Sequence, residues 1–134
     1  MALNYWEFKR LRGCRKTMTE ADGQDLVKRF GAQIDKGRFT IQVGDGILHD
    51  TKSNKLLNLT QADLEILVLL DENHAIPRWD IENQLNLEFG KKLDRNATRQ
   101  RLDDLMKRCP GVIKTEGKKK SNNFSYRLAR KDED

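Results

Sequence analysis

The side chains best suited to a chemical role lie in one stretch, DRNATRQRLDDL, which runs from Asp94 to Leu105. Arginine, asparagine and glutamine form paired hydrogen bonds to base edges in the major groove of duplex DNA, and lysine and arginine bind phosphates. A second basic stretch, EGKKKSNN, follows at 116–123. The side chains that we expect to contact nucleic acid are Arg95, Asn96, Arg99, Gln100, Arg101, Lys107, Lys118, Lys119, Lys120 and Asn122.

Three of these side chains, Asn96, Arg99 and Gln100, are the best candidates for base edges, and the cations are expected to meet phosphates. Asn96 fits equally well as a local helix cap. On a helical wheel Arg101 stands beside Leu102, so we expect it to flank a groove rather than enter it. Taken singly, each charge is also explained as a solvated surface group; the clustering favours a shared anionic partner.

Helical spacing predicts the element that carries the first stretch. Thr98, Leu102 and Leu105 recur at i, i+4 and i+7, and Cys109 extends the apolar stripe. Asp94 can cap the start of this helix by accepting hydrogen bonds from its first backbone N–H groups. The Pro-Gly pair that follows the last apolar position supplies a stop.

Charge is distributed unevenly along the 134 residues, whose net charge is +5. Residues 1–38 contain nine Lys/Arg and five Asp/Glu, residues 39–90 contain three and nine, and residues 91–131 contain fourteen and four. The last three residues are all acidic. A basic end behind an acidic middle predicts a surface that faces a polyanion and a separate face for another purpose.

The elements expected before the basic stretch begin with two short helices, at Leu3–Gly13 and across Leu26, Val27, Phe30 and Ile34. We predict that residues 1–37 form an N-terminal helical extension, which is too short to fold alone. A stabilising role, dimerisation and direct contact with nucleic acid all stay open for it. Trp6 is an aromatic side chain available for contacts in this extension.

The alternating apolar residues of Arg38–Leu59 then predict a small antiparallel sheet of about three strands. Thr60 and Asp63 have the spacing of a helix cap before the most apolar helix of the chain, which extends to Leu70. Pro77 is expected to open the next helix, with Ile81 and Leu85 facing inward, because a proline N–H is not needed there. Residues 87–93 are expected to form a loop.

After Gly111, two β-prone runs flank the basic stretch and predict a hairpin with a positively charged tip. The polar residues 131–134 are expected to form a frayed tail. The predicted domains are therefore the extension at 1–37, a compact domain at 38–130 and the tail at 131–134. The fold class is α+β: sheet, three helices and a C-terminal hairpin.

This order and four short motifs resemble the OmpR/PhoB-type winged-helix DNA-binding domain over about Gly37–Ala129. Leu59–Leu70, LTQADLEILVLL, resembles the "LT-x-x-E-x-x-L-L-x-x-L" start of the family's first helix, and Ile76-Pro77-Arg78 resembles its "V-S-R" motif. Asn96–Lys107 is similar to the recognition helix. Ile113–Gly117, with Tyr126-Arg127-Leu128 after it, is similar to the wing "I-x-T-x-x-G-x-G-Y-R-L".

The resemblance implies duplex DNA binding, with the third helix in the major groove and the basic wing on phosphates or in the minor groove. It also implies that the loop at Leu87–Leu93 can touch RNA polymerase, with Glu88 and Phe89 as candidates. The chain departs from the family at Pro77, where serine is usual, and at Met106, where arginine is usual. No phosphoacceptor receiver domain is apparent, so control through a fused receiver is not expected.

Other chemistries find little support in the residues. Cys14 and Cys109 lack neighbours with metal-ligand spacing, which favours reduced thiols and predicts neither a metal site nor a cofactor. His49 and His74 fall in different predicted elements, so we do not expect an enzyme. No secretion signal or membrane-spanning run is apparent, and we expect a cytoplasmic protein.

Two functions are therefore weighed. The first is a sequence-specific, double-stranded DNA-binding transcriptional regulator, with a homodimer plausible because paired half-sites multiply specificity. The alternative is a winged-helix adaptor that binds a protein through the acidic middle and aromatics such as Trp79. Asp103 and Asp104 motivate the alternative, because carboxylates facing a groove repel phosphates.

Overall fold

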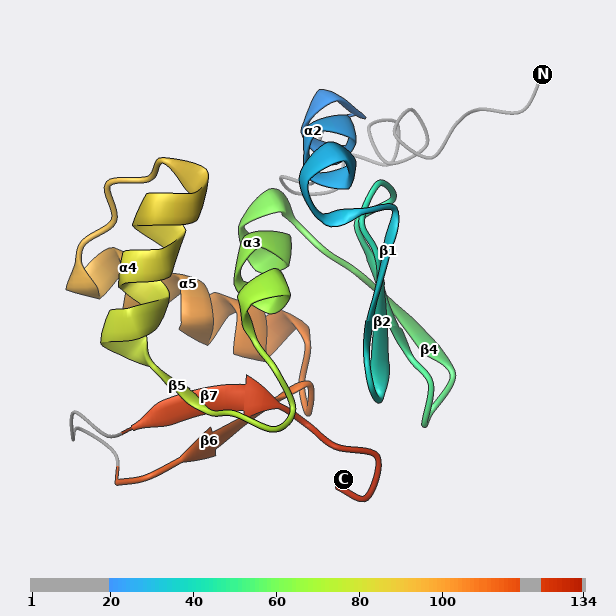
Figure 1. Ribbon diagram of the computed structural model, residues 1–134. Helices are drawn as coiled ribbons and strands as arrows, with labels where there is room; N and C mark the ends of the chain where they lie inside the picture. The colour runs from blue at the N-terminus through green and yellow to red at the C-terminus, as the bar shows by residue number, and fades with distance from the viewer. Residues whose placement is uncertain (1–19, 119–123, 134) are drawn as a thin grey trace. The chain divides into compact units, whose positions relative to one another are not determined.

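A computed structural model describes residues 20–118 and 124–133 of the chain (Figure 1). The protein is α+β, as expected, and its described part contains four helices and two antiparallel sheets. The chain divides into two compact units, Met1–Leu64 and Glu65–Asp134. The predicted domain limits, 1–37, 38–130 and 131–134, stay predictions. The expected helix at Leu3–Gly13, Trp6 and Cys14 lie outside the described residues.

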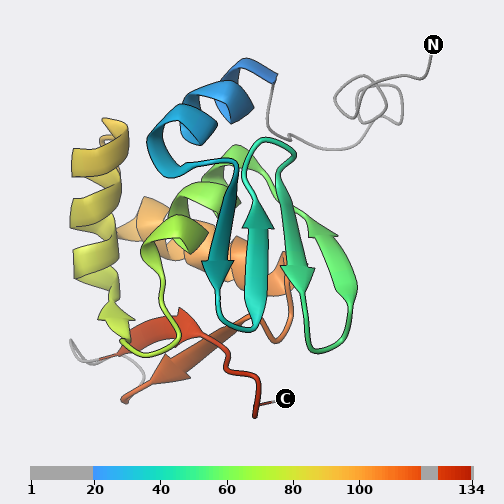
Figure 2. The same cartoon turned by 45° about the vertical axis from the view of Figure 1, so that its right-hand side comes forward.

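From Glu20 to Asn58, the first unit contains one helix and a four-stranded antiparallel meander, in which sequential strands pair in the order β1-β2-β3-β4 (Figure 2). Its elements are α2 (Glu20–Phe30), β1 (Gln33–Lys36), β2 (Phe39–Gln42), β3 (Ile47–Asp50) and β4 (Lys55–Asn58). The alternation that predicted strands at Phe39 and Ile41 is confirmed, because both side chains are fully buried while Thr40 is not. One face of this sheet therefore belongs to a core.

Strand β1 corrects the expectation that Ile34 continues the preceding helix. Helix α2 ends at Phe30, and Gly31 follows with φ +93°, a left-handed conformation that stops a helix and suits glycine. Ile34 then pairs with Ile41 in the sheet. Gly37, with φ +83°, makes the turn into β2 and donates its N–H to Asp35 at 2.9 Å. The helical spacing of apolar residues did not reveal the turns at Gly31 and Gly37, where the chain changes direction.

A buried ion pair ties the ends of β2 and β3 together. Arg38 donates from Nε and Nη2 to the two carboxylate oxygens of Asp50, each at 2.9 Å. The side chains are only 8% and 11% exposed. The hydrogen bond from Arg38 holds the pKa of Asp50 far below its ordinary value; Ser53 and Lys52 add to this effect, and burial opposes it. The two-pronged geometry fixes the relative orientation of both strands.

Helix α3 (Gln61–Leu69) begins with the predicted cap. The N–H of Thr60 donates to the Asp63 carboxylate at 3.0 Å, and the N–H of Asp63 donates to the Thr60 hydroxyl at 3.1 Å. Aspartate thus serves in the capping box, where glutamate or glutamine is more common. The predicted apolar character of this helix is confirmed by Leu64, Ile66 and Leu67, which are fully buried.

The second unit contains two further helices and a three-stranded sheet in the order β5-β7-β6. Its elements are β5 (Ile76–Pro77), α4 (Arg78–Phe89), α5 (Arg95–Arg108), β6 (Ile113–Glu116) and β7 (Ser125–Leu128). Strands β6 and β7 pair antiparallel from Ile113↔Leu128 to Glu116↔Ser125, so the predicted hairpin is confirmed. Strand β5 was not predicted: Pro77, which precedes α4, also pairs with Ser125 at the sheet edge.

Helix α4 is longer than expected, so the predicted loop at Leu87–Leu93 is corrected. The helix continues to Phe89 and ends where Gly90 adopts a left-handed conformation with φ +61°. Asn86 then clamps the short connection, because its side chain accepts from the N–H of Leu93 at 2.9 Å and donates to its carbonyl at 3.1 Å. Ile81 and Leu85 are fully buried, as predicted.

Candidate nucleic-acid interface

Helix α5 is held at its start by the residue that the sequence singled out. The Asp94 carboxylate accepts from the N–H of Ala97 at 2.7 Å. The Thr98 hydroxyl donates to the Asp94 carbonyl at 2.9 Å. These bonds satisfy groups that a helix start leaves without intrahelical partners, so the predicted cap is confirmed.

The apolar stripe of α5 is also confirmed. Thr98, Leu102 and Leu105 are fully buried, and Cys109 is 1% exposed. Cys109 closes the helix by donating its N–H to the Leu105 carbonyl at 2.9 Å. Since these four residues share one side of the helix, the rotation of α5 about its axis is fixed. Its opposite side must then face solvent.

That opposite side carries most of the side chains predicted to contact nucleic acid. The exposed members are Arg95, Asn96, Arg99, Gln100 and Lys107. Asn96 and Gln100 stand one helical turn apart, as do Arg95 and Arg99, so the four form a contiguous surface. We call the five exposed side chains, including Lys107, the α5 ridge; it combines three cations with two amides.

The two aspartates near the α5 ridge do not form a separate acidic face. Gln100 donates its side-chain amide to Asp104 at 2.9 Å. Asp103 acts on Tyr126 of β7, a residue only 5% exposed. Burial raises the pKa of Tyr126; the charge of Asp103 adds to this effect, and the charges of Arg78 and Arg99 oppose it.

Arg78 is therefore a cation near the α5 ridge that the sequence analysis missed. It opens α4 and acts electrostatically on the same tyrosine as Arg99. In the sequence it stands alone among acidic residues, 21 positions before Arg99. The basic residue of the "V-S-R"-like motif was the only signal for it. The second unit thus gathers cations from two helices beside strand β7.

Arg101 differs from the other predicted contacts. Its Nη1 lies 3.2 Å from a carboxylate oxygen of Glu65, whose side chain is only 2% exposed. Lys91 approaches the other oxygen of Glu65 at 3.5 Å. Arg101 is thus drawn toward a buried carboxylate, beside the apolar stripe. We assign it a structural role, which the sequence could not reveal because its partner lies 36 positions away.

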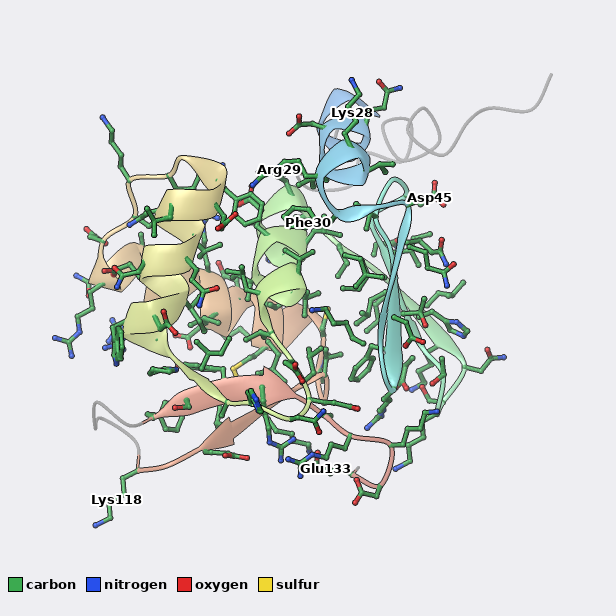
Figure 3. All side chains as sticks on the ribbon, in the orientation of Figure 1. Lys28, Arg29, Phe30, Asp45, Lys118 and Glu133 are labelled. Atoms are coloured by element: carbon green, nitrogen blue, oxygen red, sulfur yellow. The ribbon has the colours of Figure 1, made fainter. Side chains whose placement is uncertain are left out.

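Of the side chains predicted for the basic tip of the hairpin, Lys118 lies within the described residues. Lys118 is exposed and extends from the chain beyond β6, after Gly117 with φ +93° (Figure 3). Lys119, Lys120 and Asn122 lie outside the described residues. Their contribution therefore stays a prediction.

Strand β7 contributes to an ion-pair network that was not predicted. Arg127, with a side chain 8% exposed, binds Glu116 at 2.6 Å and Glu133 at 2.7 Å. Glu133 also accepts from the N–H of Arg130 at 2.7 Å. The expectation of a frayed tail at 131–134 is thus wrong for Glu133, because its carboxylate finds a buried guanidinium; Asp134 lies outside the described residues.

No family model matches the chain, and no curated protein matches it. Within residues 20–118 and 124–133, no group of three His, Cys, Asp or Glu side chains could hold a metal ion. Nor does the described part of the chain contain a helix that is long and apolar enough to cross a membrane. The α5 ridge with its neighbouring cations is the feature that most needs a functional explanation.

Proposed function

We propose that this protein is a winged-helix, sequence-specific regulator of transcription that binds double-stranded DNA. One observation carries the proposal. Helix α5 buries Thr98, Leu102 and Leu105 completely, and its solvent side carries the arginine, lysine, asparagine and glutamine side chains of the α5 ridge. In this proposal the β6–β7 hairpin, which continues into the exposed Lys118, serves as the wing that the resemblance to the OmpR/PhoB-type domain implies.

In this proposal α5 enters the major groove. Asn96, Arg99 and Gln100 read base edges, and Arg95 and Lys107 bind phosphates on either side. Gln100 must exchange its exposed bond with Asp104 for a base, which costs little because one hydrogen bond replaces another. Arg78 joins the phosphate contacts, and the wing lysines 118–120 add affinity through counterion release.

The test is a fluorescence anisotropy titration of the full chain with duplex DNA at several salt concentrations. If about four or five phosphates are neutralised, the plot of log affinity against log salt should have a slope of roughly −4. Arg99→Ala with Gln100→Ala should lower affinity and relax sequence preference. Lys55→Ala, which removes an exposed lysine of β4 in the other unit, is the control. Absence of binding to any genomic duplex at sub-millimolar protein would refute the proposal.

Two partners extend the proposal. A homodimer on paired half-sites would supply the specificity that one short helix lacks. RNA polymerase, which the resemblance implies, would meet the end of α4, where Leu87 and Glu88 are exposed. Leu87→Ser should then reduce activation in a reconstituted transcription assay without changing DNA affinity. An equal loss of DNA affinity would contradict a polymerase contact.

A second candidate function, a protein-binding adaptor, is favoured by a different observation. Trp79 is 56% exposed and Leu87 is 82% exposed, both on α4. Large exposed apolar side chains on one helix are typical of protein contacts. A pull-down that retains the same partner after nuclease treatment, and loses it in Trp79→Ala, would support the adaptor. Loss of all partners on nuclease treatment would count against it.

A further inference from the structure

Arg127 of β7 and Arg130, which follows this strand, supply three donors that converge on one carboxylate. Arg127 donates from Nη1 and Nη2 to the two carboxylate oxygens of Glu133, each at 2.7 Å. The backbone N–H of Arg130 donates to one of the same oxygens, also at 2.7 Å. A guanidinium fork with an added amide is the geometry by which proteins bind carboxylates and phosphates. We call these three donors the Arg127 cradle.

Arg127 and Arg130 each make hydrogen bonds besides those to Glu133. Arg127 lies on the central strand of its sheet, and its Nε and Nη1 also bond Glu116 at 2.6 Å and the Leu128 carbonyl at 3.0 Å. Arg130 is tied to the Glu72 carbonyl at 3.0 Å. Glu133 lies three residues beyond Arg130, after two exposed residues (Figure 3), and its backbone N–H donates to the Arg130 carbonyl at 3.0 Å. Its side chain is 25% exposed. Without Glu133, Arg127 would keep its bonds to Glu116 and to the Leu128 carbonyl.

The charges around the cradle favour an anion. In the register of the hairpin, Lys114 of β6 lies directly opposite Arg127 of β7. Like charges at directly opposed positions destabilise a sheet, so carboxylates beside this pair are stabilising. Glu133 supplies that charge within the chain. If it were withdrawn, an external oxyanion would relieve the same repulsion.

We propose that the Arg127 cradle is an oxyanion-binding site, which Glu133 occupies in cis and which binds phosphate or carboxylate groups when Glu133 is displaced. The site lies outside the α5 ridge, so the inference does not depend on DNA binding. A guest tethered by three residues has an effective concentration in the millimolar range or above. Dilute free anions therefore cannot compete with the Glu133 carboxylate. The site opens only when Glu133 is displaced or its charge is removed.

The test is an NMR titration of the full chain with inorganic phosphate, at constant ionic strength kept by chloride, following the Arg130 amide and the Arg127 Nε–H. In Glu133→Gln, both signals should shift and saturate at a concentration roughly ten-fold or more below that needed for the wild type. Asp132→Asn is the matched control, since Asp132 is an exposed acid in the same tail, and should behave as the wild type. A parallel titration with acetate shows whether carboxylates share the site.

Two outcomes would overturn the proposal. One is an E133Q protein whose hairpin signals keep their dispersion but do not respond to phosphate. The other is a wild type that responds as readily as E133Q, which would mean that Glu133 does not close the site. Adding Arg127→Lys to E133Q should abolish the response, because lysine lacks the fork that two oxygens require.

Discussion

Replacing Arg101 by alanine should destabilise the protein, although the sequence placed this residue among the DNA contacts. Its partner Glu65 has a side chain only 2% exposed, with Arg101 at 3.2 Å and Lys91 at 3.5 Å. Removing one member of a buried ion pair costs about 3–5 kcal/mol. Arg101 is 25% exposed and Lys91 remains, so we expect a smaller loss, about 2 kcal/mol. The melting temperature should then fall by roughly 8 °C.

The assay is urea unfolding followed by circular dichroism, with Arg99→Ala as the matched control. Arg99 is exposed on the same helix, so its replacement should change stability by less than about 0.5 kcal/mol. Adding Glu65→Gln to R101A should recover part of the loss, because a neutral amide replaces a buried carboxylate that has lost one of its two cations. The reasoning is refuted if R101A is as stable as the wild type, or if R99A is equally destabilised.

Three further predictions concern other parts of the chain. Asp50→Asn should lower the free energy of unfolding by about 3 kcal/mol in urea, because it removes the carboxylate charge that pairs with the buried Arg38. A loss below about 1 kcal/mol would contradict this. The hydrogen bond from Arg127 lowers the pKa of Glu133 from 4.5 to about 2. Stabilisation by this carboxylate is therefore complete above pH 4.5 and lost as pH falls toward 2. The chemical shift of the Arg130 amide, which donates to Glu133, should change as pH falls from 4.5 toward 2 in the wild type. In Glu133→Gln it should stay constant over the same pH range. Gly90→Ala should lower the free energy of unfolding in urea by about 1 kcal/mol, because alanine is strained at the left-handed φ of +61°. An added Cβ meets nothing within 4 Å, so no clash contributes. An unchanged stability would contradict this.

Elements marked by strong periodicity or capping chemistry were predictable. The α5 stripe and its Asp94 cap, the Thr60–Asp63 box of α3 and the β6–β7 hairpin all appear as expected. Each depends on residues close together in the chain, so local sequence determines it. The exposure of the α5 ridge followed from the same periodicity.

Features that depend on distant partners or on glycine conformations were not predictable. The ends of α2 and α4 are set by Gly31 and Gly90, and a periodic pattern does not reveal which glycine turns left-handed. The partners of Arg101 and Arg127 become neighbours only after folding. In the sequence Arg101 was expected among the DNA contacts, and Arg127 was noted only as part of the wing-like motif. The structure instead uses them for internal ion pairs.

Selection of duplexes from a random DNA pool tests the central proposal most directly. The wild type and Lys55→Ala should enrich the same short motif, either single or repeated as two half-sites. The Arg99→Ala, Gln100→Ala double variant should fail to enrich that motif while keeping the wild-type unfolding curve. Enrichment of the same motif by the double variant, or of no motif by the wild type, would contradict sequence reading by α5.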